Sequence, residues 1–109
     1  MSSIAREITR FSKKEIESLF KHARRVVRHS YVDILKAPRL KEFGRILVIA
    51  SAKTGNAVQR NKVKRQIRAL FYQKQYYLLP YDIIWISKKG SAPLFTFETL
   101  AKLLEKAYS

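Results

Sequence analysis

The chain has 109 residues, of which 23 are Lys or Arg and 8 are Asp or Glu, so its formal net charge at pH 7 is +15. This length predicts a single domain over residues 1–109, and a hydrophobic content of 47% argues against a wholly disordered basic tail. The absence of cysteine excludes a disulfide framework and a thiol nucleophile, and it is consistent with a cytoplasmic protein. No apolar run approaches the roughly 20 residues that a membrane span needs, so we expect no membrane-spanning segment.

The positive charge is concentrated in one region of the chain. Between residues 43 and 81 there are eight basic residues and no acidic one. A surplus of one sign opposes compaction unless an anionic partner neutralises it. Nucleic acid is therefore the leading candidate for a partner, ahead of an anionic membrane surface or an acidic protein.

The first half of the chain predicts a short arm, a helix and two strands. Residues 1–10 are polar and are expected to form a flexible arm. A helix begins after Ser12, because Ser12 and Glu15 form a capping box and apolar residues recur at positions 16, 19, 20 and 23. Residues 30–35 predict a strand, and the continuous apolar run 45–50 predicts a strand that is covered on both faces.

The second half predicts a long helix, a central strand and a final helix. Residues 53–56 predict a turn, in which Gly55 and Asn56 tolerate left-handed backbone and leave the first helix amides free for an anion. A helix follows this turn and runs to about residue 76. Residues 81–86 form an apolar strand, and Thr96 caps the last helix. The order α-β-β-α-β-α, with a parallel strand–helix–strand unit, predicts an α+β sandwich of a small mixed sheet and helices.

The long helix has two chemically different sides. At about 100° per residue, Val63, Ile67, Leu70 and Phe71 share the side expected to face the core. Polar residues occupy the other side, with one basic residue on its flank: Asn61, Lys64, Arg65, Arg68 and, flanking them, Lys62. Because these cations repel one another within two turns, a polyanion would stabilise them. Arg60 falls near the edge of the apolar side, so either the first turn is irregular or its side chain extends outward.

Other aromatic and titratable residues have simpler interpretations. Trp85 is expected in the core, and Tyr72, Tyr76 and Tyr77 are expected to cap its edge. His22 and His29 are the only imidazoles, and the isolated Asp33 and Asp82 form no carboxylate cluster in the sequence. We therefore expect no catalytic residue and no metal site in the protein itself.

Residues 51–68 match the pattern S-x-K-x-G-x-A-V-x-R-N-x-x-K-R-x-x-R at every specified position. This pattern closely resembles the signature of the bacterial ribonuclease P protein component, and the resemblance extends over residues 10–107. The resemblance implies that an RNA removes the 5′ leader of precursor tRNA, using Mg²⁺ that is held mostly by the RNA. It further implies that the protein is cytoplasmic, binds this RNA in a 1:1 complex and binds no cofactor alone. It also implies a fold like domain 2 of ribosomal protein S5, with a left-handed crossover.

The resemblance assigns two sets of contact residues. The set facing the catalytic RNA consists of Lys53, Arg60, Asn61, Lys62, Lys64, Arg65 and Arg68. Phe20 and Tyr31 match a cleft between the first helix and the sheet, where an aromatic ring can stack on an unpaired base of the leader.

The chain departs from the family pattern at several positions. Ala23 and Leu47 stand where glycine is frequent, and Ala52 stands where a second lysine is usual. Asp33 occupies a cleft position that is commonly apolar, and Lys88 replaces a frequent arginine after the third strand. These departures leave the basic helix unchanged and bear on recognition of the leader.

Three functions remain open at this stage. The first is the protein subunit of a ribonucleoprotein endonuclease, which would stimulate cleavage only together with an RNA. The second is a pure RNA-binding module of the ribosomal-protein kind, which would bind RNA without stimulating cleavage. The third is peripheral binding to anionic membranes, which the commitment of the apolar helix side to the core disfavours.

Overall fold

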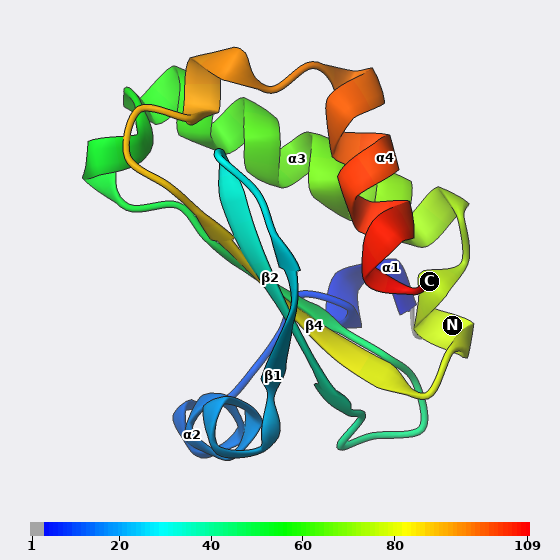
Figure 1. Ribbon diagram of the computed structural model, residues 1–109. Helices are drawn as coiled ribbons and strands as arrows, with labels where there is room; N and C mark the ends of the chain where they lie inside the picture. The colour runs from blue at the N-terminus through cyan, green and yellow to red at the C-terminus, as the bar shows by residue number, and fades with distance from the viewer. Residues whose placement is uncertain (1–3) are drawn as a thin grey trace.

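A four-stranded mixed sheet forms the centre of the molecule in this computed structural model, which describes residues 4–109 (Figure 1). The spatial order of its strands is β1-β2-β4-β3. Their bounds are Arg24–Arg28 for β1, Val32–Pro38 for β2, Ile46–Ile49 for β3 and Tyr81–Ser87 for β4. β2 pairs antiparallel with β1 and β4, whereas β3 pairs parallel with β4. The parallel pair is joined through a helix, which confirms the predicted strand–helix–strand unit.

Helices cover the two faces of this sheet unequally. Their bounds are Ile4–Glu7 for α1, Lys13–His22 for α2, Ala57–Gln73 for α3 and Phe97–Ala107 for α4. α3 and α4 lie together on one face, and α2 lies at one end of the other face (Figure 1). This arrangement confirms the predicted α+β sandwich. The handedness of the crossover and the likeness to ribosomal protein S5 stay predictions.

The larger core fills the space between the sheet and the pair α3 and α4. Fully buried residues from both layers contribute, among them Ile34, Phe71, Trp85 and Leu100. Trp85 donates its indole N–H to Ser87 Oγ at 3.1 Å, so the buried polar atom is satisfied. The core position predicted for Trp85 is thus confirmed.

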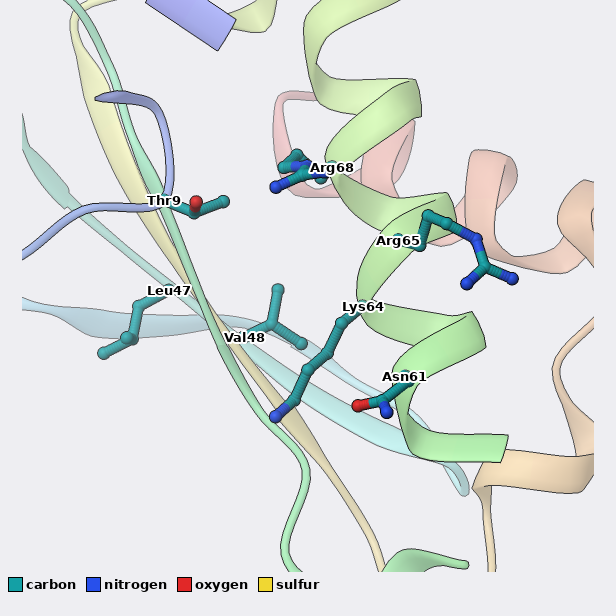
Figure 2. A pocket seen from close by; sticks show the side chains of 7 residues that line it. All are labelled: Thr9, Leu47, Val48, Asn61, Lys64, Arg65 and Arg68. Carbon is teal, nitrogen blue, oxygen red and sulfur yellow. The ribbon is translucent and has the colours of Figure 1, made fainter. Parts of the chain in front are cut away.

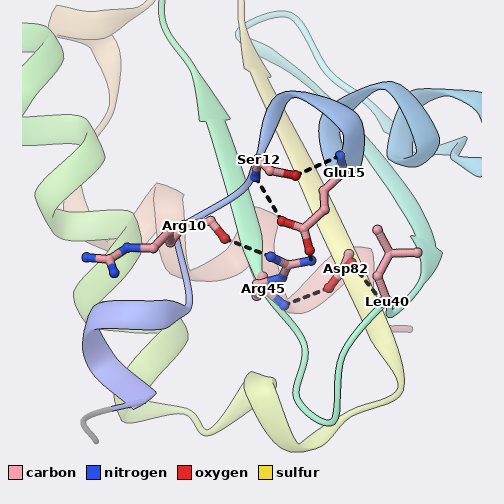
Figure 3. Close-up of polar contacts among 6 residues, drawn as sticks. All are labelled: Arg10, Ser12, Glu15, Leu40, Arg45 and Asp82. Carbon is pink, nitrogen blue, oxygen red and sulfur yellow. Dashed lines mark hydrogen bonds and ion pairs between the residues drawn. The ribbon is translucent and has the colours of Figure 1, made fainter.

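α2 is attached to the sheet through a buried arginine (Figure 3). Arg45 is 0% exposed, and its guanidinium donates to the Arg10 carbonyl at 2.7 Å and to Glu15 Oε2 at 3.0 Å. The same guanidinium lies 4.2 Å from the ring centroid of Phe11. Asp82 accepts from the Arg45 backbone N–H at 2.8 Å. Together these contacts fix the start of α2 against β3 and β4.

Sequence patterns predicted the starts of α2 and α4 correctly. Ser12 caps α2, its Oγ accepting from the Glu15 backbone N–H while Glu15 accepts from the Ser12 backbone N–H, so the predicted capping box is confirmed. Thr96 caps α4 as predicted. α3 ends at Gln73, three residues before the predicted position.

Two expectations about the sheet were wrong. The strand β1 was missed, because three of its five residues are arginines. β3 is an edge strand and only Ile46 of it is fully buried, so it is not covered on both faces. Within the segment predicted as an arm, α1 precedes Ile8, which is 0% exposed and whose carbonyl accepts from the Ile46 backbone N–H at 2.7 Å, while the flexibility of the arm stays a prediction. Residues 1–3 of that arm lie outside the described residues.

No helix within residues 4–109 is both long enough and apolar enough to cross a bilayer.

Candidate nucleic-acid interface

The start of α3 is fixed by a capping box that the sequence analysis missed. Asn56 has an extended backbone, and its side chain accepts from the Gln59 backbone N–H at 2.8 Å. Gln59 accepts in return from the Asn56 backbone N–H at 3.0 Å. The expectation of left-handed backbone was therefore wrong, because Gly55 (φ 165°) and Asn56 (φ −74°) are both extended. The capping box occupies one first-turn amide, that of Gln59, and anion binding by the others stays a prediction. Gly55 is needed for space instead, since a Cβ atom there would lie 2.8 Å from Ala92 Cβ.

α3 separates apolar and cationic side chains as its periodicity predicts. Val63, Ile67, Leu70 and Phe71 are buried in the core. The exposed residues of the opposite side, here called the α3 ridge, are Asn61, Lys62, Lys64, Arg65 and Arg68. Because the apolar side is packed, the helix holds these cations at fixed spacing despite their mutual repulsion.

A hollow of about 390 Å³ lies between the α3 ridge and the edge strand β3 (Figure 2). Its lining residues are Thr9, Leu47, Val48, Asn61, Lys64, Arg65 and Arg68. Lys64 reaches toward β3, whereas the guanidinium of Arg65 points away from the sheet (Figure 2). The hollow thus combines an apolar wall with cations and an amide, which are the groups that bind phosphates and hydrogen-bond to bases or riboses.

The cations of the α3 ridge have no acidic partner among the residues that the structure describes. Five ion pairs occur within residues 4–109, and none includes a residue of the ridge. Residues 43–81 also contain no Asp or Glu. This uncompensated charge makes the ridge a candidate surface for binding a polyanion.

Lys53 and Arg60 flank the ridge in different environments. Lys53 is exposed on a short 3₁₀ turn, Ala52–Thr54, whose position is fixed because the Lys53 carbonyl accepts from the Gly90 backbone N–H at 2.9 Å. Arg60 is half-buried in a regular first turn, and its Nε is buried without a hydrogen-bond partner among the described residues. Of the two alternatives for Arg60, the irregular turn is therefore excluded.

Phe20 and Tyr31 are not brought together. Phe20 is 42% exposed on α2, although the periodicity placed it on the buried face, and it follows Leu19, which packs beside Ala37 near the end of β2. Tyr31 lies before the start of β2, where its half-buried ring contacts Phe95 at 5.7 Å between centroids. At about 3.3 Å per residue, the length of β2 separates them by roughly 20 Å.

The sheet face beside α2 carries an apolar surface that the sequence analysis did not assign to any site. Four half-buried aliphatic residues form it together with the fully buried Ile84: Leu35, Leu47, Ile49 and Ile86. We call this surface the open sheet face. At its far end Asp33 lies 3.7 Å from Arg25 and 3.5 Å from Lys88, so neighbouring cations compensate its charge. No signal in the sequence indicated this surface, because the surface depends on how little of this sheet face the ten-residue α2 covers.

The remaining titratable residues form no cluster of metal-ligand type. Within residues 4–109 no three His, Cys, Asp or Glu side chains lie close enough to hold a metal ion. His22 Nδ1 lies 2.9 Å from the Ser18 carbonyl on its own helix, and His29 Nδ1 accepts from the Tyr31 backbone N–H at 3.0 Å.

The fold and the α3 ridge together define a small basic α+β protein with one strongly cationic helix. Comparison with known sequences identifies its family. The profile of the Ribonuclease P family matches residues 7–109, and the chain belongs to the family of bacterial ribonuclease P protein components. Membership assigns the chain to tRNA processing.

Individual relatives agree with this assignment. The ribonuclease P protein component of Petrotoga mobilis is 35% identical over 71% of this chain and 65% of its own length, so the alignment spans slightly less than two thirds of that relative. The Streptococcus agalactiae protein is 32% identical over 85% of this chain and 84% of its own length.

Solved structures of the family have the same fold. The Staphylococcus aureus RNase P protein superposes with a TM-score of 0.76 at 24% identity, covering 93% of this chain and 92% of that one. The Thermotoga maritima protein gives a TM-score of 0.72 at 22% identity, covering 89% and 91%. This likeness supports the strand order and the placement of α2, α3 and α4 described above.

Proposed function

We propose that this protein is the protein subunit of a ribonuclease P ribonucleoprotein, in which an RNA cleaves the 5′ leader from precursor tRNA. The α3 ridge carries the proposal, because its cations are held at fixed spacing and form no ion pair with any residue in the described part of the chain. In this assignment the catalytic RNA binds the ridge together with Lys53 and Arg60, in a 1:1 complex. Arginine provides paired donors for phosphate oxygens, and lysine provides a mobile charge.

The leader of the precursor is assigned to the open sheet face and Phe20. The exposed Phe20 ring can stack on an unpaired base, and the aliphatic surface beside it accepts base faces without selecting a sequence. A contact with Tyr31, expected from the family resemblance, would require the leader to extend along β2 from Phe20 to the residues before the start of that strand.

The protein contributes binding and no catalytic group. The reaction uses Mg²⁺, which we assign to the RNA, and the cations of the protein lower the repulsion between the two RNA molecules. Lower repulsion strengthens binding of the precursor and reduces the Mg²⁺ concentration needed for cleavage. The proposal needs no cofactor bound by the protein alone.

Cleavage of a precursor tRNA with a 5′ leader at low Mg²⁺ tests the proposal. Four samples are compared: buffer, the protein, a bacterial ribonuclease P RNA, and the protein with that RNA. We expect efficient cleavage at the mature 5′ end only in the combined sample. Cleavage by the protein alone would overturn the assignment of catalysis to the RNA. Tight RNA binding without any stimulation would instead support a ribosomal-type binding module.

A further inference from the structure

A second hollow of about 340 Å³ lies on the other side of Arg65 and Arg68, between α1 and the C-terminal half of α3. Its lining residues are Ala5, Arg6, Ile8, Arg65, Arg68, Ala69 and Tyr72. Arg65 and Arg68 also line the first hollow, so the two hollows are neighbours on either side of these side chains.

Tyr72 is the unusual residue of this second hollow. It was expected to cap the core edge with Tyr76 and Tyr77, and those two residues do pack against the core. Tyr72 is instead 44% exposed. Its ring stacks on Tyr77 with centroids 5.7 Å apart and planes inclined by 19°, so the ring is held in place while it lines the hollow.

The walls around Tyr72 are cationic above an apolar floor. Arg6 from α1 joins Arg65 and Arg68 from α3, and none of the three takes part in an ion pair within residues 4–109. The floor is the fully buried Ile8, and Ala69 beside it is small enough to leave room above it. A phosphate alone would need only the arginines, whereas the tyrosine and the floor suit a flat apolar ring.

We propose that this second hollow binds one unpaired nucleotide of the RNA that contacts the α3 ridge, with its base against Tyr72 and its phosphate beside Arg6. The inference rests on the proposed function, because it requires an RNA partner on the ridge. It adds a specific requirement: the RNA must present an unstacked base where the ridge meets α1. Stacking of bases on aromatic rings accepts any base, so the site selects unpaired structure over sequence.

Binding of fluorescently labelled ribonuclease P RNA tests this proposal, with a fully paired RNA duplex as the second probe and one fixed salt concentration. Tyr72→Leu removes the aromatic face, and Tyr72→Phe retains it. Phe97→Leu is the matched control, because Phe97 is similarly exposed, at 46%, on α4. We expect Tyr72→Leu to weaken binding of ribonuclease P RNA at least about fivefold, and the other two variants to bind within about twofold of the original protein.

Arg6→Ala provides a second, independent measurement. Removing one phosphate contact lowers the slope of log affinity against log salt concentration by about 0.7–0.9. Lys106→Ala, an exposed cation on α4, is expected to leave the slope unchanged. Cross-linking of the original protein to ribonuclease P RNA that contains 4-thiouridine requires no variant, and we expect an adduct on Tyr72 or an adjacent residue of the hollow.

The outcomes separate this inference from the proposed function. The nucleotide site is overturned if Tyr72→Leu and Arg6→Ala both bind ribonuclease P RNA with normal affinity and still stimulate cleavage. That result would leave the proposed function intact. Equal weakening of duplex and ribonuclease P RNA binding by Tyr72→Leu also overturns it, because the effect would not depend on unpaired bases. If the original protein neither binds the RNA nor stimulates cleavage, both proposals fail.

Discussion

Replacing Glu15 by glutamine tests whether the buried Arg45 contact network stabilises the fold. The Arg45 hydrogen bond, followed by that from the Ser12 backbone, lowers the pKa of Glu15 from 4.5 to about 2. At about 1.4 kcal/mol per pH unit, this difference corresponds to roughly 3 kcal/mol of preference for the charged form in the folded state. The Glu15 side chain is 23% exposed, so solvent screens part of this energy. We expect Glu15→Gln to lower the free energy of unfolding at pH 7 by about 2 kcal/mol.

The pH dependence gives the sign of the effect. Because the folded-state pKa of Glu15 is depressed, its contribution is fully present above pH 4.5 and is lost as the pH falls toward 2. Burial raises the pKa of Asp82, and this opposite contribution is present in both proteins, so it largely cancels in their difference. The two proteins should therefore differ most at pH 7 and converge in acid.

Urea unfolding followed by Trp85 fluorescence measures both quantities, since Trp85 is the single tryptophan and is fully buried. Glu17→Gln is the matched control, because Glu17 is exposed on the same helix and takes part in no ion pair within residues 4–109. A Glu15→Gln protein as stable as the Glu17→Gln control at pH 7 would refute this account of the contact. So would a difference from the original protein that is as large at pH 2 as at pH 7, because most of the contribution is lost by pH 2.

Three further changes test the ridge and the turns around it. Arg65→Ala should weaken binding of ribonuclease P RNA by about fivefold or more. The urea midpoint should stay unchanged because Arg65 is exposed, and unchanged affinity in a folded variant would remove Arg65 from the interface. Asn56→Ala should cost about 1 kcal/mol of stability by removing the α3 cap, which urea unfolding measures, and a cost below about 0.3 kcal/mol would contradict the capping geometry. Gly44→Ala should destabilise the protein by about 2 kcal/mol or more, because its Cβ would lie 2.4 Å from the Tyr81 carbonyl oxygen; a variant that melts at the original temperature would show that the loop can move aside.

Features determined by local sequence were the ones predicted correctly. The caps at Ser12 and Thr96 depend on side chains that bond to backbone within three residues, so a short segment contains all the information. The buried side of α3 follows from its own periodicity, because the segment is long and its four core positions recur regularly.

Features determined by strand order could not be read in the same way. Residues 45–50 and 81–86 are similar apolar runs, yet β4 is central and β3 lies at an edge. The exposure of Phe20 has the same origin, since periodicity defines a helix face but not how much of the sheet lies beneath it. β1 was hidden because an edge strand with one solvated face can carry arginines at most of its positions.

The edge strand β3 also explains how one small domain can present two RNA surfaces. Leu47 lines the hollow beside the α3 ridge, and it packs into the apolar cluster of the open sheet face. Its neighbour Val48 faces the larger core and lines the same hollow. The two proposed surfaces therefore meet along a single strand of four residues, so an RNA on the ridge and a leader on the open sheet face would lie within one side chain of each other. Leu47 belongs to both surfaces, so we expect the size of its side chain to affect binding of the catalytic RNA and of the leader together.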